Sequence, residues 1–192
     1  GPPLYQDANA AAADATLLVN RVKPHTDFHG QIESGLAKMA VIGMGKDTGA
    51  QLVHVYGARG FIRFLAPAAR IYEANTNLAG GVALLENAFG ETAEVHALDV
   101  SEVGTAAETA LLEKARALMP RLPFDSIDIL VIKEIGKNFS GTGMDTNVVG
   151  RLMIPRMAED HKPDVAVIAV LNISDESHGN AAGIGLGNVT TL

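Results

Sequence analysis

The chain of 192 residues contains no cysteine and no tryptophan, and aromatic residues make up only 5% of it. The absence of cysteine excludes disulfides, iron–sulfur clusters and thiolate zinc sites within this sequence. Any metal bound here must therefore be held by histidine nitrogen or by oxygen ligands. Because aromatic rings are scarce, the core must be built mainly from Ala, Val, Leu, Ile and Met.

Basic clusters and long apolar runs are also missing. The formal charge is −7, and no stripe of Lys and Arg of the kind that binds nucleic-acid phosphates is present. No apolar run approaches the roughly 20 residues that cross a bilayer, and no secretory leader pattern is found. We therefore expect neither nucleic acid nor membrane as a partner, and we predict a cytoplasmic location.

The two ends of the sequence indicate a piece of a longer protein. The chain opens with "GPPLYQDANAAAAD", without an initiator methionine, and stops with "GNVTTL" just after a glycine-rich loop. Catalytic groups can lie in the missing parts, so we expect this piece alone to be inactive. The sequence carries no indication of an oligomeric state.

Continuous apolar runs separated by helical patterns predict an α/β fold. The runs over 127–132 and 165–173 do not alternate, which is typical of parallel strands covered on both faces. A glycine-rich loop and a candidate helix over 146–160 lie between them, in the order of a βαβ unit. Mostly parallel sheets with flanking helices are expected. Further strands are predicted over 15–20, 81–85 and 93–100, and further helices over 8–13 and 61–75.

The most regular helical pattern begins at Thr105. Thr105 and Glu108 have the spacing of a capping box, an apolar stripe follows, and Pro120 ends the pattern. Earlier in the chain, Asp47 is a predicted N-cap, with Gly57 and Gly60 as helix stops. The chain is thus expected to hold parts of two α/β domains, over residues 1–120 and 121–192.

Three predicted strands are followed at once by polar or glycine-rich loops. These loops are "NRVKPHTDFHG", "KEIGKNFSGTGMDTN" and "NISDESHGNAAGIGLGN". In open α/β sheets, ligands gather at the carboxyl ends of the strands, so the loops favour one shared site. Each loop also has a plainer interpretation as a solvated turn, and Asp27, Glu33, Asp175 and Glu176 are more typical of solvated groups.

Two stretches carry a resemblance to a known family. "NRVKPHTDFHGQIESGLAKMAVIGMGKDTGA" and "EIGKNFSGTGMDTNVVGR" resemble the nickel-dependent lactate racemase-like family, in particular a largely uncharacterised racemase-like branch. In that family a Pro-His is followed by a Ser-Gly-Gly loop and a lysine. The lysine holds a nickel pincer nucleotide, and a histidine sixteen residues later ligates the nickel. The resemblance implies that 1–120 is the end of an N-terminal, cofactor-binding domain and that 121–192 starts a C-terminal domain.

The site residues follow from this resemblance. It implies that His25 is a catalytic acid/base, that Lys38 is the cofactor attachment point with Ser34 and Gly35 beside it, and that His54, sixteen residues after Lys38, is the nickel ligand. This sequence reads Ser34-Gly35-Leu36 and has three more residues between His25 and Lys38 than the family pattern. The family's second catalytic histidine would lie upstream of Gly1.

The implied reaction is racemisation or epimerisation of a 2-hydroxy acid. It needs a base such as imidazole, a hydride acceptor that only a cofactor supplies, and a cation for the substrate carboxylate. Lys23 is the nearby candidate for that cation, and Lys133 and Lys137 are further candidates. Two alternatives stay open. One is a non-catalytic α/β domain that binds a nucleotide or anionic metabolite; the other is a metal-dependent hydrolase or lyase with His25, His29 and Asp27 as ligands.

Overall fold

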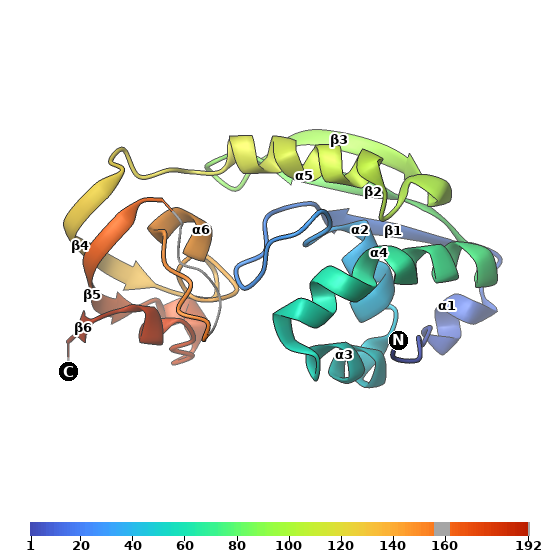
Figure 1. Ribbon diagram of the computed structural model, residues 1–192, viewed down its shortest axis with the longest axis horizontal. Helices are drawn as coiled ribbons and strands as arrows, with labels where there is room; N and C mark the ends of the chain where they lie inside the picture. The colour runs from blue at the N-terminus through green and yellow to red at the C-terminus, as the bar shows by residue number, and fades with distance from the viewer. Residues whose placement is uncertain (156–161, 192) are drawn as a thin grey trace. The chain divides into compact units, whose positions relative to one another are not determined.

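The computed structural model describes residues 1–155 and 162–191. The chain divides into two compact units, Gly1–Met119 and Pro120–Leu192 (Figure 1). Each unit holds a three-stranded sheet together with helices, so the α/β prediction is confirmed. Among the described residues, no helix is long and apolar enough to cross a membrane.

The sheet of the first unit has the order β1-β2-β3 and is mixed. Strands β1 (Thr16–Arg21) and β2 (Leu78–Glu86) are parallel, whereas β3 (Thr92–Asp99) runs antiparallel to β2. This one antiparallel pair arises because only five residues join β2 to β3. A connection this short makes a hairpin and cannot carry the crossover that a parallel pair needs.

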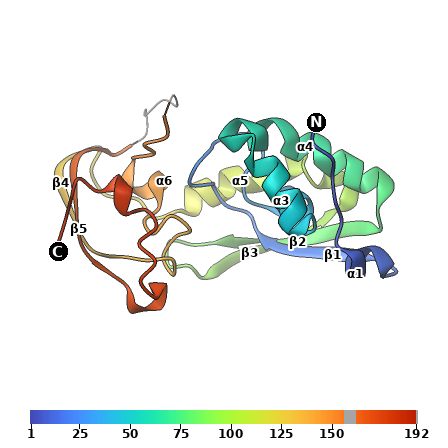
Figure 2. The same cartoon turned by 90° about the horizontal axis from the view of Figure 1, so that it is seen from below.

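Helices cover one face of this sheet, and Figure 2 shows α3, α4 and α5 on the same side of it. The core includes Leu18 and Leu85 from the strands and Leu65 and Leu112 from the helices, all buried. The opposite face is open, since Leu17 on β1 is 61% exposed. The helices of this unit are α1 (Ala8–Ala12), α2 (Leu36–Lys38), α3 (Lys46–His54), α4 (Gly57–Asn75) and α5 (Ala106–Leu118), with a π-helical turn, η1 (Met39–Gly43), after α2 and a 3₁₀ turn, η2 (Val100–Glu102), before α5.

Three local predictions for this unit are wrong. Gly57 begins α4 rather than ending a helix, because its positive φ of 60° turns the chain between α3 and α4. Gly60 lies inside α4, where a Cβ would come within 2.4 Å of the Tyr56 Cβ. Asp47 lies in the first turn of α3, and Gly45 is the N-cap. Thr105 does cap α5, as predicted, by accepting a hydrogen bond from the Ala107 N–H.

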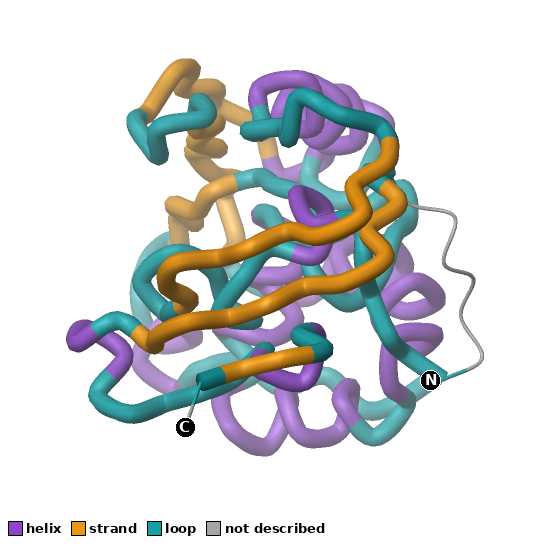
Figure 3. The backbone as a smooth tube through the Cα atoms, turned by 90° about the vertical axis from the view of Figure 1, so that its left-hand side faces the viewer, coloured by secondary structure: helices purple, strands orange, loops and turns teal. Residues whose placement is uncertain are grey.

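The sheet of the second unit is parallel. It has β5 (Asp164–Ile173) between β4 (Ser126–Ile135) and the short β6 (Val189–Thr190), as Figure 3 shows. The buried residues Ile135, Ile168 and Val170 form its core. The prediction that both faces are covered is wrong, because Ile129 and Val131 are 64% and 58% exposed.

The predicted helix over 146–160 is much shorter. Helix α6 covers Thr146–Val149 and ends at Gly150, whose φ of 67° is left-handed. A Cβ on Gly150 would meet the Pro163 carbonyl oxygen at 1.9 Å, so this close approach requires glycine. Residues 151–155 are not helical, and the rest of the predicted span, 156–160, lies outside the described residues.

Candidate functional site

The loop after β1 is closed by a single antiparallel bridge between Lys23 and Ser34. The Lys23 N–H donates to the Ser34 carbonyl oxygen at 3.0 Å. The ten residues between them fold back as one compact loop, 24–33. The bridge therefore brings Lys23 next to Ser34, which leads directly into Gly35 and helix α2.

Glu33 fills the inside of this loop and is 1% exposed, so its expected place in solvent is wrong. Its carboxylate accepts hydrogen bonds from the His25 N–H at 2.6 Å and the Gly30 N–H at 2.9 Å. It also contacts His29 Nδ1 at 3.3 Å and pairs with the guanidinium of Arg116 on α5. Burial alone would raise the pKa of Glu33, but these partners hold it below its ordinary value.

Gly35 and α2 lie against a second buried carboxylate, that of Glu108. Glu108 accepts hydrogen bonds from the Ala37 N–H at 3.2 Å and the Gly104 N–H at 2.8 Å. A Cβ on Gly35 would come within 2.2 Å of Glu108 Oε1, so only glycine fits there. The expected capping box fails because Glu108 bonds to these two groups instead of the Thr105 N–H. Burial raises the pKa of Glu108.

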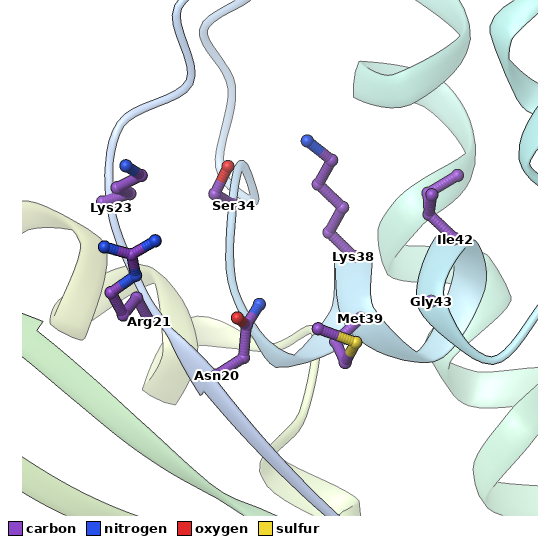
Figure 4. A pocket seen from close by; sticks show the side chains of 8 residues that line it. All are labelled: Asn20, Arg21, Lys23, Ser34, Lys38, Met39, Ile42 and Gly43. Atoms are coloured by element: carbon purple, nitrogen blue, oxygen red, sulfur yellow. The ribbon is translucent and has the colours of Figure 1, made fainter. Parts of the chain in front are cut away.

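A cavity of about 270 Å³ opens beside Lys38. Figure 4 shows Ser34 between the side chains of Lys23 and Lys38 at this cavity. Burial lowers the pKa of Lys38, and the positive charge of Lys23 lowers it further against the opposing effect of Asp27. The lining residues are Asn20, Arg21, Lys23, Ser34, Lys38, Met39, Ile42 and Gly43.

The ring of Phe61 on α4 brings the three predicted catalytic and cofactor residues together. Lys38 Nζ lies 5.6 Å from its centroid. The His54 ring lies edge-on to it at 4.9 Å, and the His25 ring is stacked at 6.1 Å. Phe28 packs beside both His25 and Phe61, with its ring centroid 4.2 Å from that of His25 and 5.0 Å from that of Phe61. Neither phenylalanine is among the residues predicted from the sequence; the position of Phe28 between His25 and His29 is the one signal that the sequence offers.

His25 is held as a neutral imidazole at neutral pH. Burial, and then the charge of Lys38, lowers the pKa of His25 to about 4. Its Nδ1 accepts a hydrogen bond from the Asp27 N–H at 3.0 Å. Because a backbone N–H can only donate, the hydrogen of the neutral ring is assigned to Nε2.

His54 is exposed, and its Nδ1 lies 2.6 Å from the Ala50 carbonyl oxygen, one turn earlier in α3. A carbonyl oxygen only accepts, so in the neutral ring Nδ1 carries the hydrogen and Nε2 keeps a lone pair. This arrangement is common for histidines that ligate metals. Across residues 1–155 and 162–191, no group of three or more His, Cys, Asp or Glu residues is arranged to hold a metal ion. The trio His25, His29 and Asp27 is therefore not such a group.

The two lysines predicted in the second unit lie in different elements. Lys133 lies within β4 rather than after it, and it is exposed. Lys137 lies in the loop after β4, where its ammonium group donates to the Gly141 carbonyl oxygen of the same loop. Neither lysine is brought together with another predicted site residue by a contact within this unit.

Buried hydroxyl groups join the loops after β4 and β5. The Lys137 N–H donates to Ser177 Oγ at 2.8 Å, and Ser177 Oγ lies 2.9 Å from Ser174 Oγ. Ser174 Oγ in turn donates to Asn138 Oδ1 at 2.7 Å. A Cβ on Gly136 would come within 2.8 Å of all three side-chain oxygens. This chain of hydrogen bonds holds the two loops together, and its polar atoms are satisfied by one another.

Comparisons with protein-family models, with curated proteins and with solved structures found no match to this chain. The resemblance to the nickel-dependent lactate racemase-like family thus stays a prediction from the sequence.

Proposed function

We propose that this chain contributes the cofactor site of a racemase or epimerase that acts on a 2-hydroxy acid and uses a nickel pincer nucleotide. One observation carries the proposal. His25, Lys38 and His54, which are 29 residues apart from first to last in the sequence, all lie against the single ring of Phe61. These are the residues to which the family resemblance assigns proton transfer, cofactor attachment and nickel binding.

The residues fit such a cofactor. The lowered pKa of Lys38 leaves more of its amine neutral, and a neutral amine is the form that makes a covalent bond. His54 offers the lone pair of Nε2 to a metal, as its Nδ1 is engaged by the Ala50 carbonyl oxygen. Lys23 and Arg21, at the cavity beside Lys38, suit an anionic group such as a phosphate or carboxylate. When bound, the cofactor supplies the acceptor that takes a hydride from carbon and returns it.

The protein residues have two further tasks in this reaction. Lys23 attracts the carboxylate of the substrate to the cavity it shares with Lys38. His25 exchanges a proton with the substrate oxygen as hydroxyl and carbonyl interconvert. The positive charge of Lys38 is one of the causes that lower the pKa of His25, and it is lost where the amine forms an uncharged covalent link. Loss of this charge, together with a substrate anion bound nearby, shifts the pKa of His25 upward from about 4, toward the range that suits proton transfer at neutral pH.

The test is to produce the protein together with the enzymes that make the cofactor and then to separate the roles of the residues. Purified protein is analysed for nickel, and a panel of 2-hydroxy acids is followed for interconversion of enantiomers. His54→Ala is expected to lower nickel content while an adduct on Lys38 remains. Lys46→Ala, an exposed lysine of α3 paired with Asp7, is the matched control and is expected to retain both. Nickel-loaded full-length protein that interconverts no 2-hydroxy acid would count against the reaction.

A second candidate function is the binding of a nucleotide or anionic metabolite without turnover. It is favoured by the cavity itself, which places the cations Arg21, Lys23 and Lys38 beside the polar groups of Asn20 and Ser34. Isothermal titration with nucleoside phosphates and with simple carboxylates tests it. Saturable binding that Lys23→Ala weakens, in protein that acquires no nickel, would favour this candidate over the racemase.

A further inference from the structure

The loop that carries His25 is organised around one buried carboxylate, that of Glu33. We propose that Glu33 is a positioning residue that holds neutral His25 in the tautomer with hydrogen on Nε2. The role of this tautomer in proton exchange rests on the proposed function. The presence of the tautomer in the folded chain does not depend on that function.

Glu33 binds the loop at several points, and one of them is the backbone of His25 itself. Its Oε2 accepts the His25 N–H at 2.6 Å, while its Oε1 accepts the Gly30 N–H at 2.9 Å. Oε1 also contacts His29 Nδ1 at 3.3 Å and the Arg116 guanidinium. A carboxylate has enough lone pairs for these donors, and no other ordinary side chain of similar size does. The conformation of 25–30 therefore depends on the charge and the two oxygens of Glu33.

The same loop conformation determines which nitrogen of His25 carries the hydrogen. The Asp27 N–H points to His25 Nδ1 at 3.0 Å, two residues along the chain. The stacked ring of the buried Phe28, with its centroid 4.2 Å away, limits rotation of the imidazole. Nδ1 is thus an acceptor, and Nε2 is left as the nitrogen through which the neutral ring donates.

Arg116 connects this arrangement to α5 and supplies a matched control. One guanidinium nitrogen pairs with Glu33, and the other lies 2.6 Å from Glu113, whose side chain is 60% exposed. Glu113→Gln also removes a carboxylate charge that pairs with Arg116, but among the described residues Glu113 makes no hydrogen bond to the loop, so the loop is left unchanged. Glu33→Gln instead replaces one acceptor oxygen by an amide NH₂, which meets donors that it cannot accept from.

Long-range ¹H–¹⁵N spectra of the histidine rings, recorded on the full chain without nickel or cofactor, test the proposal. His25 is identified among the six histidines by its loss in His25→Gln. In the unaltered chain we expect the Nδ1 signal at a pyridine-type shift and the Nε2 signal at a pyrrole-type shift. Glu33→Gln should mix the two tautomers, and Glu113→Gln should leave the spectrum unchanged.

A pH titration of the same signals adds a second readout. The charged and titratable groups that face His25 are Lys38, Asp27, Glu33 and His29. Two effects of Glu33→Gln on the His25 midpoint oppose each other. Removing the Glu33 charge alone would move the midpoint down, but burial is the largest cause of the lowered pKa of His25. A loosened loop that exposes the ring should therefore move the midpoint upward from about 4.

The proposal is overturned if the unaltered chain shows His25 with hydrogen on Nδ1, a result that does not depend on the folding of Glu33→Gln. It is also overturned if folded Glu33→Gln keeps the tautomer and midpoint of the unaltered chain. These spectra contain no cofactor, so a failure of the racemase proposal leaves them unaffected and the two outcomes can be told apart.

Discussion

The histidine at the centre of the site should make the first unit sensitive to acid. His25 has a pKa of about 4 in the folded chain and an ordinary value of 6.5 when unfolded. Between these values the unfolded chain binds more protons, so the free energy of unfolding falls as the pH falls from 6.5 to 4. One pKa unit corresponds to about 1.4 kcal/mol. Between pH 7 and pH 4.5, His25 should therefore remove about 2 kcal/mol of stability.

The variant His25→Gln measures this contribution, because other acid-sensitive groups such as Glu33 remain in both proteins and largely cancel in the difference. Urea unfolding is followed by tyrosine fluorescence at pH 7 and pH 4.5. This probe reports on the first unit, since Tyr5, Tyr56 and Tyr72 all lie within Gly1–Met119. The variant should lose about 2 kcal/mol less than the parent over this interval.

The control is His178→Asn, which changes an exposed histidine of the second unit at a left-handed position that asparagine tolerates. It should keep the full pH dependence of the parent. If His25→Gln showed the same loss of stability as the parent between pH 7 and pH 4.5, the burial and charge argument for His25 would be wrong.

Three further predictions concern single positions. Gly35→Ala should destabilise the first unit by about 1–3 kcal/mol in urea unfolding, because a Cβ would lie 2.2 Å from the buried Glu108 carboxylate; an unchanged midpoint would contradict this. Gly136→Ala should lower the thermal midpoint of the second unit, because its Cβ would meet three side-chain oxygens within 2.8 Å, whereas Gly141→Ala, with open space around it, should not. Lys38 should react with an amine-specific acylating reagent at pH 8 to a greater extent per exposed area than Lys46, because the pKa of Lys38 is lowered. Peptide mass spectrometry measures the extent of acylation at each lysine, and a greater extent at Lys46 would contradict this prediction.

Much of the fold could be predicted from the sequence because strands are short apolar runs with polar loops at their ends. The runs near β1, β2, β4 and β5 were all recognised, and the helix capped by Thr105 begins as its local signals indicate. Two of the errors occurred where a glycine has more than one use. Gly57 turns the chain between α3 and α4, whereas Gly150 ends α6 early against Pro163. No local sequence pattern distinguishes a glycine that turns the chain from one that ends a helix.

The candidate site was predictable only in part for a related reason. His25 and Lys38 lie in one loop-and-helix segment directly after a strand, so their closeness follows from local sequence. Phe61 and Arg116 come from helices that pack onto this segment from far along the chain. Glu33 was misjudged because a glutamate is ordinarily solvated, and only the donors gathered around it make its burial favourable.

The most direct test of the proposed site is the mass of the protein and of its Lys38 peptide after production with the enzymes that make the cofactor. We expect an adduct on Lys38, nickel bound in proportion to it, and the loss of both in Lys38→Ala but not in Lys46→Ala. Full-length protein that carries neither an adduct nor nickel under these conditions would contradict the account.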